Sequence, residues 1–279
     1  MSKEDLTCCV TACERPLDQT YWNTQWQNNT TGWDIGYPAP AIVKFMDEWV
    51  NKESSILIPG CGNAYEAEYL IEKGFQNITL IDIAPDAVLR VQKKFEGRPE
   101  VNIILGDFFT HEGQYDLIIE QTFLSALPPL LRPKYVWKMH HLLKENGRLI
   151  GLLFNRQFDV SPPFGGSIVE YERMFDGAFT WNEIKVANNS IPERKEMEVF
   201  IDLKKRSEVL AKLYAFKGIT CNGCMDTVET KINELPEVIN VQMASDYSNL
   251  LICMNTPILL SQLQNIISYD KKYSIEPIG

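Results

Sequence analysis

Leu57-Ile58-Pro59-Gly60-Cys61-Gly62-Asn63-Ala64 is the stretch that decides the fold. Its apolar first half is typical of a short buried strand. The glycines that follow allow the backbone to turn tightly and to approach a ligand at the start of the next helix. A tight turn without a ligand has the same residues, so the polar residues elsewhere in the chain must decide between the two interpretations.

Strand and helix patterns alternate around this turn, from about residue 55 to residue 205. Apolar runs predict strands over 56–59, 77–83, 101–105, 115–120 and 148–154, with two further strands near 181–186 and 197–203. Helical spacing predicts helices over 64–73, 86–96, 132–144 and 168–175. Near-continuous apolar strands suit a parallel sheet buried on both faces. The alternation therefore predicts a doubly wound α/β fold.

Polar side chains follow the later strands at one edge of this predicted sheet. Asp82 ends the second strand, 20 residues after Gly62, a spacing at which a carboxylate accepts hydrogen bonds from ribose hydroxyls. Asp107 ends the third strand, and Glu120 and Gln121 end the fourth. The alternatives are a helix N-cap for Asp82 and an ordinary turn residue for Asp107.

The chemistry of the predicted cofactor depends on two further features. A NAD(P)-binding turn has a third glycine where Tyr65 stands, which disfavours a dinucleotide. Trp22, Trp26 and Trp33 fall within twelve residues ahead of the first strand. Aromatic faces attract cations, so residues 18–37 are interpreted as a Trp-rich lid over a cationic sulfonium. The alternative is a helix that precedes the sheet and packs through its aromatic side chains.

These motifs occur together in one group of enzymes. They are Trp22-x3-Trp26, Thr31-Gly32-Trp33-Asp34-x-Gly36, the turn quoted above, Leu80-Ile81-Asp82-Ile83, Gly106-Asp107-Phe108-Phe109, Arg132-Pro133 with Leu142-Leu143-Lys144-x2-Gly147, and Phe164-Gly165-Gly166. Over residues 18–205 the chain resembles the thiopurine methyltransferase family, in particular its plant-type halide/thiocyanate/thiol methyltransferase branch.

The resemblance implies a class I Rossmann-like methyltransferase domain over residues 1–206, with a tail over 1–17, and S-adenosylmethionine as cosubstrate. Nine residues are expected to bind this cofactor: Trp22, Trp26, Trp33, Gly60, Gly62, Asp82, Asp107, Phe108 and Gln121. The branch often carries an aromatic residue at position 121.

Transfer of a methyl group from a sulfonium is an in-line displacement, for which the enzyme mainly positions the reactants and excludes water. Soft nucleophiles need little help from a general base. We therefore expect a small acceptor such as a thiol, a halide, thiocyanate or a metalloid, and no catalytic residue is assigned. The acceptor-pocket candidates are Tyr37, Phe123, Asn155 and Arg156.

A second, smaller pattern begins after residues 207–211, which are interpreted as a linker. Strands near 213–219, 238–244, 250–254 and 273–277 and helices over 224–235 and 257–268 are expected. Their order, β-α-β-β-α-β, is that of a small α+β ferredoxin-like domain. Cys221 and Cys224 stand at C-x-x-C spacing where its first helix begins, and two such thiols suit Cu(I), or Zn(II) with further ligands.

Residues 212–279 resemble the heavy-metal-associated domain of copper chaperones and metal-pumping ATPases, with Ile219 where that family usually has Met. The resemblance implies a soft-metal ion as ligand and a protein partner that exchanges metal. A domain that has lost its metal and a thioredoxin-like redox pair are the alternatives. For the whole chain, the alternative to an enzyme is a metal-binding or metal-delivery protein with the methyltransferase fold as scaffold or acting on an unrelated small molecule.

Composition limits the remaining partners. The net charge of −10 disfavours nucleic acid, which needs clustered Lys and Arg. Neither a signal peptide nor an apolar stretch of spanning length is recognised, so no membrane partner and a cytoplasmic location are expected. Cys8, Cys9 and Cys13 form a second thiol cluster, interpreted as an incidental part of the tail, with capture of a further metal or metalloid as the alternative.

Overall fold

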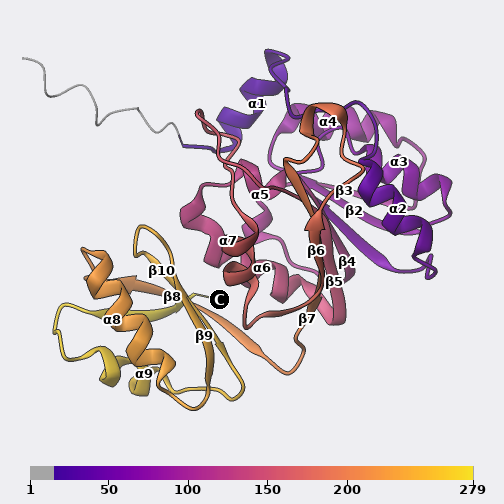
Figure 1. Ribbon diagram of the computed structural model, residues 1–279. Helices are drawn as coiled ribbons and strands as arrows, with labels where there is room; N and C mark the ends of the chain where they lie inside the picture. The colour runs from indigo at the N-terminus through magenta and orange to yellow at the C-terminus, as the bar shows by residue number, and fades with distance from the viewer. Residues whose placement is uncertain (1–15, 279) are drawn as a thin grey trace, which may run out of the picture.

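The computed structural model describes residues 16–278, which form two sheets and the helices around them. Figure 1 shows the larger sheet with helices on both sides and the smaller sheet at one end of the molecule. The cysteines of the N-terminal tail lie outside the described residues. The helices of the larger unit are α1 (Gln19–Gln27), α2 (Pro40–Glu48), α3 (Tyr65–Glu72), α4 (Pro85–Lys94), α5 (Phe123–Ala126), α6 (Arg132–Leu142) and α7 (Ile168–Phe175).

The larger sheet has seven strands in the order β3-β2-β1-β4-β5-β7-β6. Its strands are β1 (Ser55–Pro59), β2 (Asn77–Asp82), β3 (Val101–Leu105), β4 (Tyr115–Gln121), β5 (Leu143–Phe154), β6 (Phe179–Val186) and β7 (Glu198–Lys205). The pairings among β1 to β5 are parallel, and β7 runs antiparallel to both β5 and β6. The predicted doubly wound α/β fold is confirmed.

Both faces of this sheet are buried, which explains the near-continuous apolar strands. Side chains of α2 and α3 pack on one face, with Met46 and Leu70 fully buried. Side chains of α6 and α7 pack on the other, with Tyr135 and Phe175 fully buried. The strand order reverses between β1 and β4, and ligands of open α/β sheets bind at the carboxyl ends of the strands at such a point.

The smaller unit follows the predicted order of elements. Its elements are β8 (Leu210–Lys217), α8 (Asn222–Asn233), β9 (Val238–Met243), β10 (Asn249–Met254), α9 (Leu260–Ile267) and β11 (Ser274–Ile278), and all pairings in its sheet, β11-β8-β10-β9, are antiparallel. β8 begins at Leu210, so the last two residues of the predicted linker belong to a strand. Val209 just before it is buried in the core of the larger unit.

Two differences from the expected boundaries have simple causes. The helix predicted over 132–144 ends at Leu142, because Leu143 takes an extended backbone and pairs with Tyr115 of β4. Strand β5 therefore begins earlier than the sequence indicates, and Asn146 (φ 61°) marks an irregularity within it.

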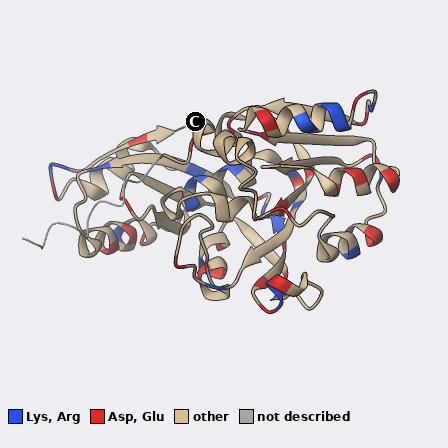
Figure 2. Ribbon diagram, turned by 90° about the horizontal axis from the view of Figure 1, so that it is seen from above, with Lys and Arg blue, Asp and Glu red and all other residues tan. Residues whose placement is uncertain are grey.

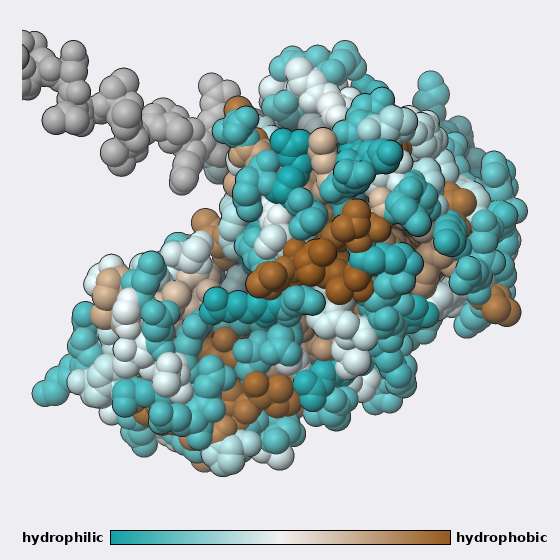
Figure 3. All heavy atoms as spheres, viewed as in Figure 1, coloured by the Kyte–Doolittle hydropathy of each residue, from teal (hydrophilic) through white to brown (hydrophobic). Residues whose placement is uncertain are grey.

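The surface is mixed in character. Figure 2 shows acidic and basic residues interspersed along the outer helices. Figure 3 shows a mostly polar face on which apolar side chains gather in a few patches. Within residues 16–278, no helix has the length and apolar character needed to cross a membrane.

Candidate active site

The turn after β1 forms the floor of the site. Gly60 and Gly62 adopt φ of 58° and 52°, and Ala64, which precedes α3, adopts φ of 52°. Glycine reaches this left-handed region without the cost that a side chain imposes. A Cβ at Gly60 would lie 2.5 Å from Cδ2 of Phe123, so glycine is also required for space. The turn thus brings bare backbone to the carboxyl edge of the sheet, as the sequence predicts.

Asp82 lies beside this turn at the end of β2. Its Oδ2 accepts a hydrogen bond from the Gly62 amide (3.0 Å), and its Oδ1 accepts one from the Ala84 amide (2.9 Å). Burial raises the pKa of this carboxyl, and the amide donors oppose the shift. The carboxylate therefore helps to form the local turn and also lines the cavity described below. The N-cap alternative for Asp82 is wrong, because Ala84 is the residue that precedes α4 and no side chain caps this helix.

Helix α1 and the segment after it form an aromatic wall. Trp26 is buried against Ala84 and Ala87 of the α4 region, with Trp22 and Trp33 packed beside it. The Trp22 and Trp33 rings meet edge to face at a centroid distance of 5.6 Å. The tryptophans thus pack the helix against the domain and also line the cavity.

Two polar contacts fasten this wall to the domain. Asn23 Oδ1 accepts a hydrogen bond from the Asp86 amide at the start of α4 (2.8 Å). Asp34 Oδ2 accepts one from Asn63 Nδ2 in the glycine turn (2.5 Å). The aromatic wall is thereby joined to both the turn and the helix that follow β1 and β2.

The third and fourth strands supply the remaining floor. Asp107 caps a short 3₁₀ helix by accepting a hydrogen bond from the Phe109 amide (2.8 Å). The Phe108 ring is buried and meets the Phe123 ring at a centroid distance of 5.0 Å. Phe123 contacts both Gly60 and, edge to face, Phe108, and all three residues line the cavity.

Glu120 at the end of β4 is fully buried beneath this floor. Its Oε1 accepts a hydrogen bond from the Leu124 amide of α5 (3.0 Å), and its Oε2 accepts one from the Tyr135 hydroxyl of α6 (2.7 Å). Burial raises the pKa of Glu120 to about 7, and these donors oppose the shift. Glu120 therefore fixes the position of α5 through the Leu124 amide. Helix α5 contributes Phe123, Ser125 and Ala126 to the cavity.

These elements enclose one large cavity of about 870 Å³, a size typical of small-molecule sites. The predicted residues that line it are Trp22, Trp26, Trp33, Gly60, Asp82, Asp107, Phe108, Phe123 and Arg156. A buried carboxylate, bare turn backbone and an aromatic wall suit the hydroxyls, carboxylate and cationic sulfur of S-adenosylmethionine. Gly62 is not among the lining residues, and its backbone amide donates the hydrogen bond to Asp82 described above.

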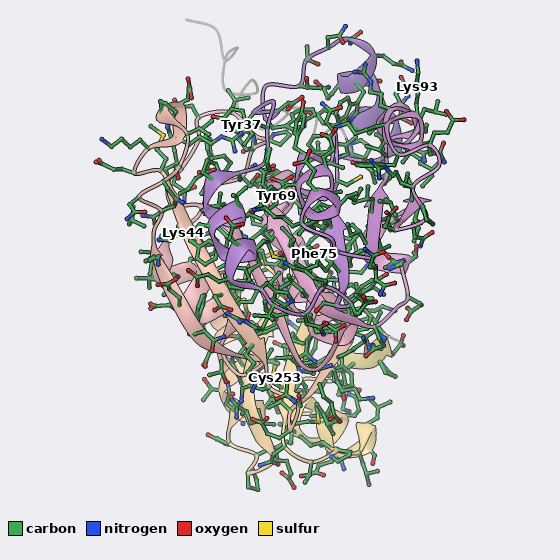
Figure 4. All side chains as sticks on the ribbon, turned by 90° about the vertical axis from the view of Figure 1, so that its right-hand side faces the viewer. Tyr37, Lys44, Tyr69, Phe75, Lys93 and Cys253 are labelled. Carbon is green, nitrogen blue, oxygen red and sulfur yellow. The ribbon has the colours of Figure 1, made fainter. Side chains whose placement is uncertain are left out.

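Three other predicted residues lie outside the cavity lining. Gln121 lies with Ile35 and Leu152 at a shallow depression, because neighbouring residues of a strand point to opposite faces. Tyr37 is exposed on the surface, as Figure 4 shows. The Asn155 side chain accepts a hydrogen bond from the Ile168 amide (3.2 Å) and thus caps α7.

The segment that precedes β7 also contributes to the cavity, although no sequence pattern predicts it. Glu193, Arg194 and Met197 line the cavity. The Arg194 guanidinium donates to the carbonyl of Trp33 (2.7 Å) and pairs with the buried Glu198 carboxylate (3.2 Å). This arginine ties the aromatic wall to the far end of the sheet. No local motif marks it, because its partners lie in distant segments.

The two thiols of the smaller unit lie together. Cys221 Sγ and Cys224 Sγ are 2.8 Å apart where α8 begins, and Cys221 is exposed. Hydrogen bonds from Cys221 and then from Tyr273 lower the pKa of the Cys224 thiol. In the described part of the chain, no group of three or more His, Cys, Asp and Glu side chains forms a candidate metal centre.

Comparisons with known proteins agree with this architecture. The family model of thiopurine S-methyltransferase matches residues 17–212. A probable thiol methyltransferase 2 of Arabidopsis thaliana is 32% identical over 194 residues, covering 67% of this chain and 85% of that protein. A thiocyanate methyltransferase 1 of the same plant is 26% identical and covers 68% and 86%.

The fold is also shared with a solved structure. Magnesium protoporphyrin IX methyltransferase from Synechocystis PCC 6803, solved with bound SAM, superimposes with a TM-score of 0.55 at 14% identity and covers 67% of this chain and 94% of that one. The family model, the two plant relatives and the solved structure all match the larger unit, and all are methyltransferases. The chain therefore belongs to the thiopurine S-methyltransferase family and is an S-adenosylmethionine-dependent methyltransferase.

Proposed function

We propose that this enzyme methylates a small soft nucleophile: a thiol, a halide or thiocyanate, or a metalloid. The observation that carries the proposal is the chemistry of the cavity wall. Aromatic rings and two arginines are among the described residues that line it, together with the carboxylates of Asp18, Asp82, Asp107 and Glu193. The two arginines suit an acceptor that is already anionic, and such an acceptor needs no base to remove a proton. The names of the two plant relatives point the same way.

The acceptor is assigned to the part of the cavity lined by Phe154, Arg156, Phe158 and Arg194. The Arg194 side chain is only 11% exposed, and its charge is shared with Glu198. In the reaction, a lone pair of the acceptor forms a bond to the methyl carbon as the carbon–sulfonium bond breaks. The bonding electrons return to sulfur, which leaves as neutral S-adenosylhomocysteine. The protein aligns the two reactants and excludes water.

An acceptor screen with S-adenosylmethionine labelled in its methyl group tests this proposal. The panel comprises iodide, thiocyanate, hydrosulfide, aromatic thiols, selenite, tellurite and arsenite, with an oxygen and a nitrogen nucleophile for comparison. Methylation of at least one soft acceptor is expected, and at a cofactor concentration below the wild-type Kd it should be strongly reduced in Asp82→Ala. Methylation of only the oxygen or nitrogen nucleophile by protein that binds the cofactor would overturn the acceptor class.

For the smaller unit we propose a ferredoxin-like, heavy-metal-associated domain that binds one Cu(I) or Zn(II) ion through Cys221 and Cys224. The β-α-β-β-α-β order, the antiparallel sheet and the close, accessible thiols support it. Two thiolates suit Cu(I), whereas Zn(II) needs further ligands from outside the pair. Metal delivery with the larger domain as a mere scaffold, the alternative considered for the whole chain, is not supported, because that domain belongs to a methyltransferase family.

Metal titration of the full chain tests this second proposal. The wild type should bind one equivalent of Cu(I) or Zn(II), and Cys221→Ser/Cys224→Ser should bind none. The affinity for S-adenosylmethionine serves as the control and should be equal in both proteins. Equal metal binding by wild type and double variant would place the metal elsewhere, and absence of binding by the wild type would indicate a domain that no longer binds metal.

A further inference from the structure

The smaller unit is joined to the methyltransferase domain by a shared core. One face of its sheet carries α8 and α9, which bury their own cluster of side chains. From the opposite face, Leu213, Leu251 and Cys253 are each 1% exposed and pack into the cluster that contains side chains of α6 and α7. Strands β8 and β10 lie against α6, and the contact with α7 is made through the hydrogen bonds described next. Figure 4 shows Cys253 where the two units meet. The face of the smaller sheet that bears no helices is thus covered by the larger domain.

Side chains of β9 form hydrogen bonds with backbone carbonyls at the C-terminal end of α7. The last carbonyls of a helix have no partner within the helix. Gln242 Nε2 donates to the carbonyls of Arg173 and Met174 (2.9 Å each), and Asn240 Nδ2 donates to the carbonyl of Asp176 (2.8 Å). Two amide side chains of β9 therefore cap a helix of the other domain.

Gly177 allows the close approach that these hydrogen bonds need. It follows α7 with φ of 81°, and a Cβ at this position would lie only 2.6 Å from Cβ of Asn240. The junction is therefore built around a position where glycine alone fits. The contact between the two units therefore depends on Gly177 in the larger unit and on Asn240 in the smaller one.

The N-terminal half of α7 contacts the segment 154–166, which forms one wall of the cavity. The Tyr171 hydroxyl donates to the carbonyl of Phe154 (2.7 Å), and Glu170 pairs with Arg132. The Arg132 guanidinium also donates to the carbonyl of Gly165 (2.6 Å). These bonds, with the Asn155 cap, fix both ends of the segment 154–166. The cavity residues of this segment are Phe154, Arg156, Phe158, Pro162 and Pro163.

We infer that the C-terminal domain is a positioning element of the active site. It caps and packs the C-terminal end of α7, and α7 in turn fixes the segment 154–166 that forms the acceptor side of the cavity. Asn240 and Gln242 are positioning residues in this arrangement, acting through α7 and distant from the turn that receives the cofactor. The role is independent of whether Cys221 and Cys224 hold a metal.

Substitution in the full chain is the appropriate test, because deletion of the domain would expose Phe175 and its neighbours. Asn240→Asp/Gln242→Glu keeps the size of both side chains and replaces each donor with a carboxylate that faces carbonyl oxygens. Repulsion at the negative end of the helix should release α7. Asn265→Asp, at an exposed residue of α9, is the control for a negative charge added to this domain away from α7.

Amide hydrogen exchange followed peptide by peptide gives the readout. Exchange over 154–166 should become at least tenfold faster in the double variant and stay unchanged in Asn265→Asp. Peptides 57–64 and 224–235 should exchange as in the wild type, which shows that the cofactor turn and the C-terminal domain remain folded. For the acceptor found in the screen, KM should rise while the Kd of S-adenosylmethionine stays within twofold.

Asn240→Ala/Gln242→Ala is the second variant, because it removes the donors without adding charge. It should change exchange in the same direction by a smaller factor, and it decides the question if the charged variant unfolds the C-terminal domain. Unchanged exchange over 154–166, with faster exchange confined to 172–177, would overturn the inference. An equal rise over 57–64 would also overturn it, because the effect would then be general loosening of the domain.

Discussion

The Gly62 amide donates a 3.0 Å hydrogen bond to Oδ2 of Asp82, joining the turn after β1 to the end of β2. These two residues are 20 positions apart, yet they meet because β1 and β2 pair in parallel and end at the same edge. This bond and the one from the Ala84 amide to Oδ1 orient the carboxylate, and each oxygen keeps a further lone pair for a ligand. The cofactor site thus depends on two strand ends rather than on the glycine turn alone.

Replacement of Asp82 should weaken cofactor binding. Hydrogen bonds to a charged group contribute about 1.5–3 kcal/mol each, so Asp82→Ala should lower the affinity for S-adenosylmethionine by a factor of about ten or more. Isothermal titration calorimetry measures the change. Glu96→Ala, an exposed carboxylate beyond α4, is the control and should bind as the wild type does. Wild-type affinity in Asp82→Ala would remove Asp82 from the site.

Replacement of Gly60 by alanine should lower the unfolding free energy by more than the left-handed backbone conformation alone explains. Gly97 has φ of 76° and open space around it, so Gly97→Ala bears only the cost of the left-handed conformation, about 1–2 kcal/mol. Gly60→Ala bears that cost and the clash with Phe123. Chemical denaturation should therefore show a larger loss of unfolding free energy for Gly60→Ala, together with weaker cofactor binding. Equal losses in the two variants would mean that Phe123 moves aside freely.

Glu120 should make the stability depend on pH. Its pKa is raised in the folded protein from 4.5 to about 7, so folding favours the protonated form. The stabilisation is complete below the unfolded pKa and is lost as pH rises through about 7. The shift corresponds to about 3 kcal/mol between these limits.

The measurement is the difference in unfolding free energy between wild type and Glu120→Gln from pH 4 to 8. Wild type should lose stability relative to the variant as pH rises over this range. The exposed Glu96→Gln serves as control and should track the wild type at every pH. A pH-independent difference for Glu120→Gln would show that the carboxyl does not change its ionisation in this range.

Replacement of Arg194 should destabilise the protein, because it leaves the buried Glu198 carboxylate without its partner. The side chains of Arg194 and Glu198 are 11% and 3% exposed. Breaking such a pair from one side costs about 3–5 kcal/mol, so Arg194→Met should lose a similar amount of unfolding free energy. Arg194→Met/Glu198→Leu should recover most of it. Lys185→Met breaks an exposed pair with Glu183 and should cost less than about 1 kcal/mol. An equally small effect at Arg194 would contradict the prediction.

Much of the architecture follows from local patterns. Apolar runs mark the strands, and parallel pairing brings their carboxyl ends to one edge, so Gly60, Asp82, Asp107 and Phe108 gather as predicted. The order of elements in the smaller unit and the proximity of Cys221 and Cys224 follow in the same way. These features depend on contacts within an element or between neighbouring strand ends, which periodicity and spacing encode.

Other features depend on how whole elements pack. Glu120 and Gln121 are adjacent in the sequence, yet one lies beneath α5 and the other on the opposite side, because the pleat alternates side chains between faces. Arg194 enters the cavity only because β7 lies next to β5. The docking of Asn240 and Gln242 on α7 likewise needs both folded domains, since its partners are backbone carbonyls that carry no mark in the sequence.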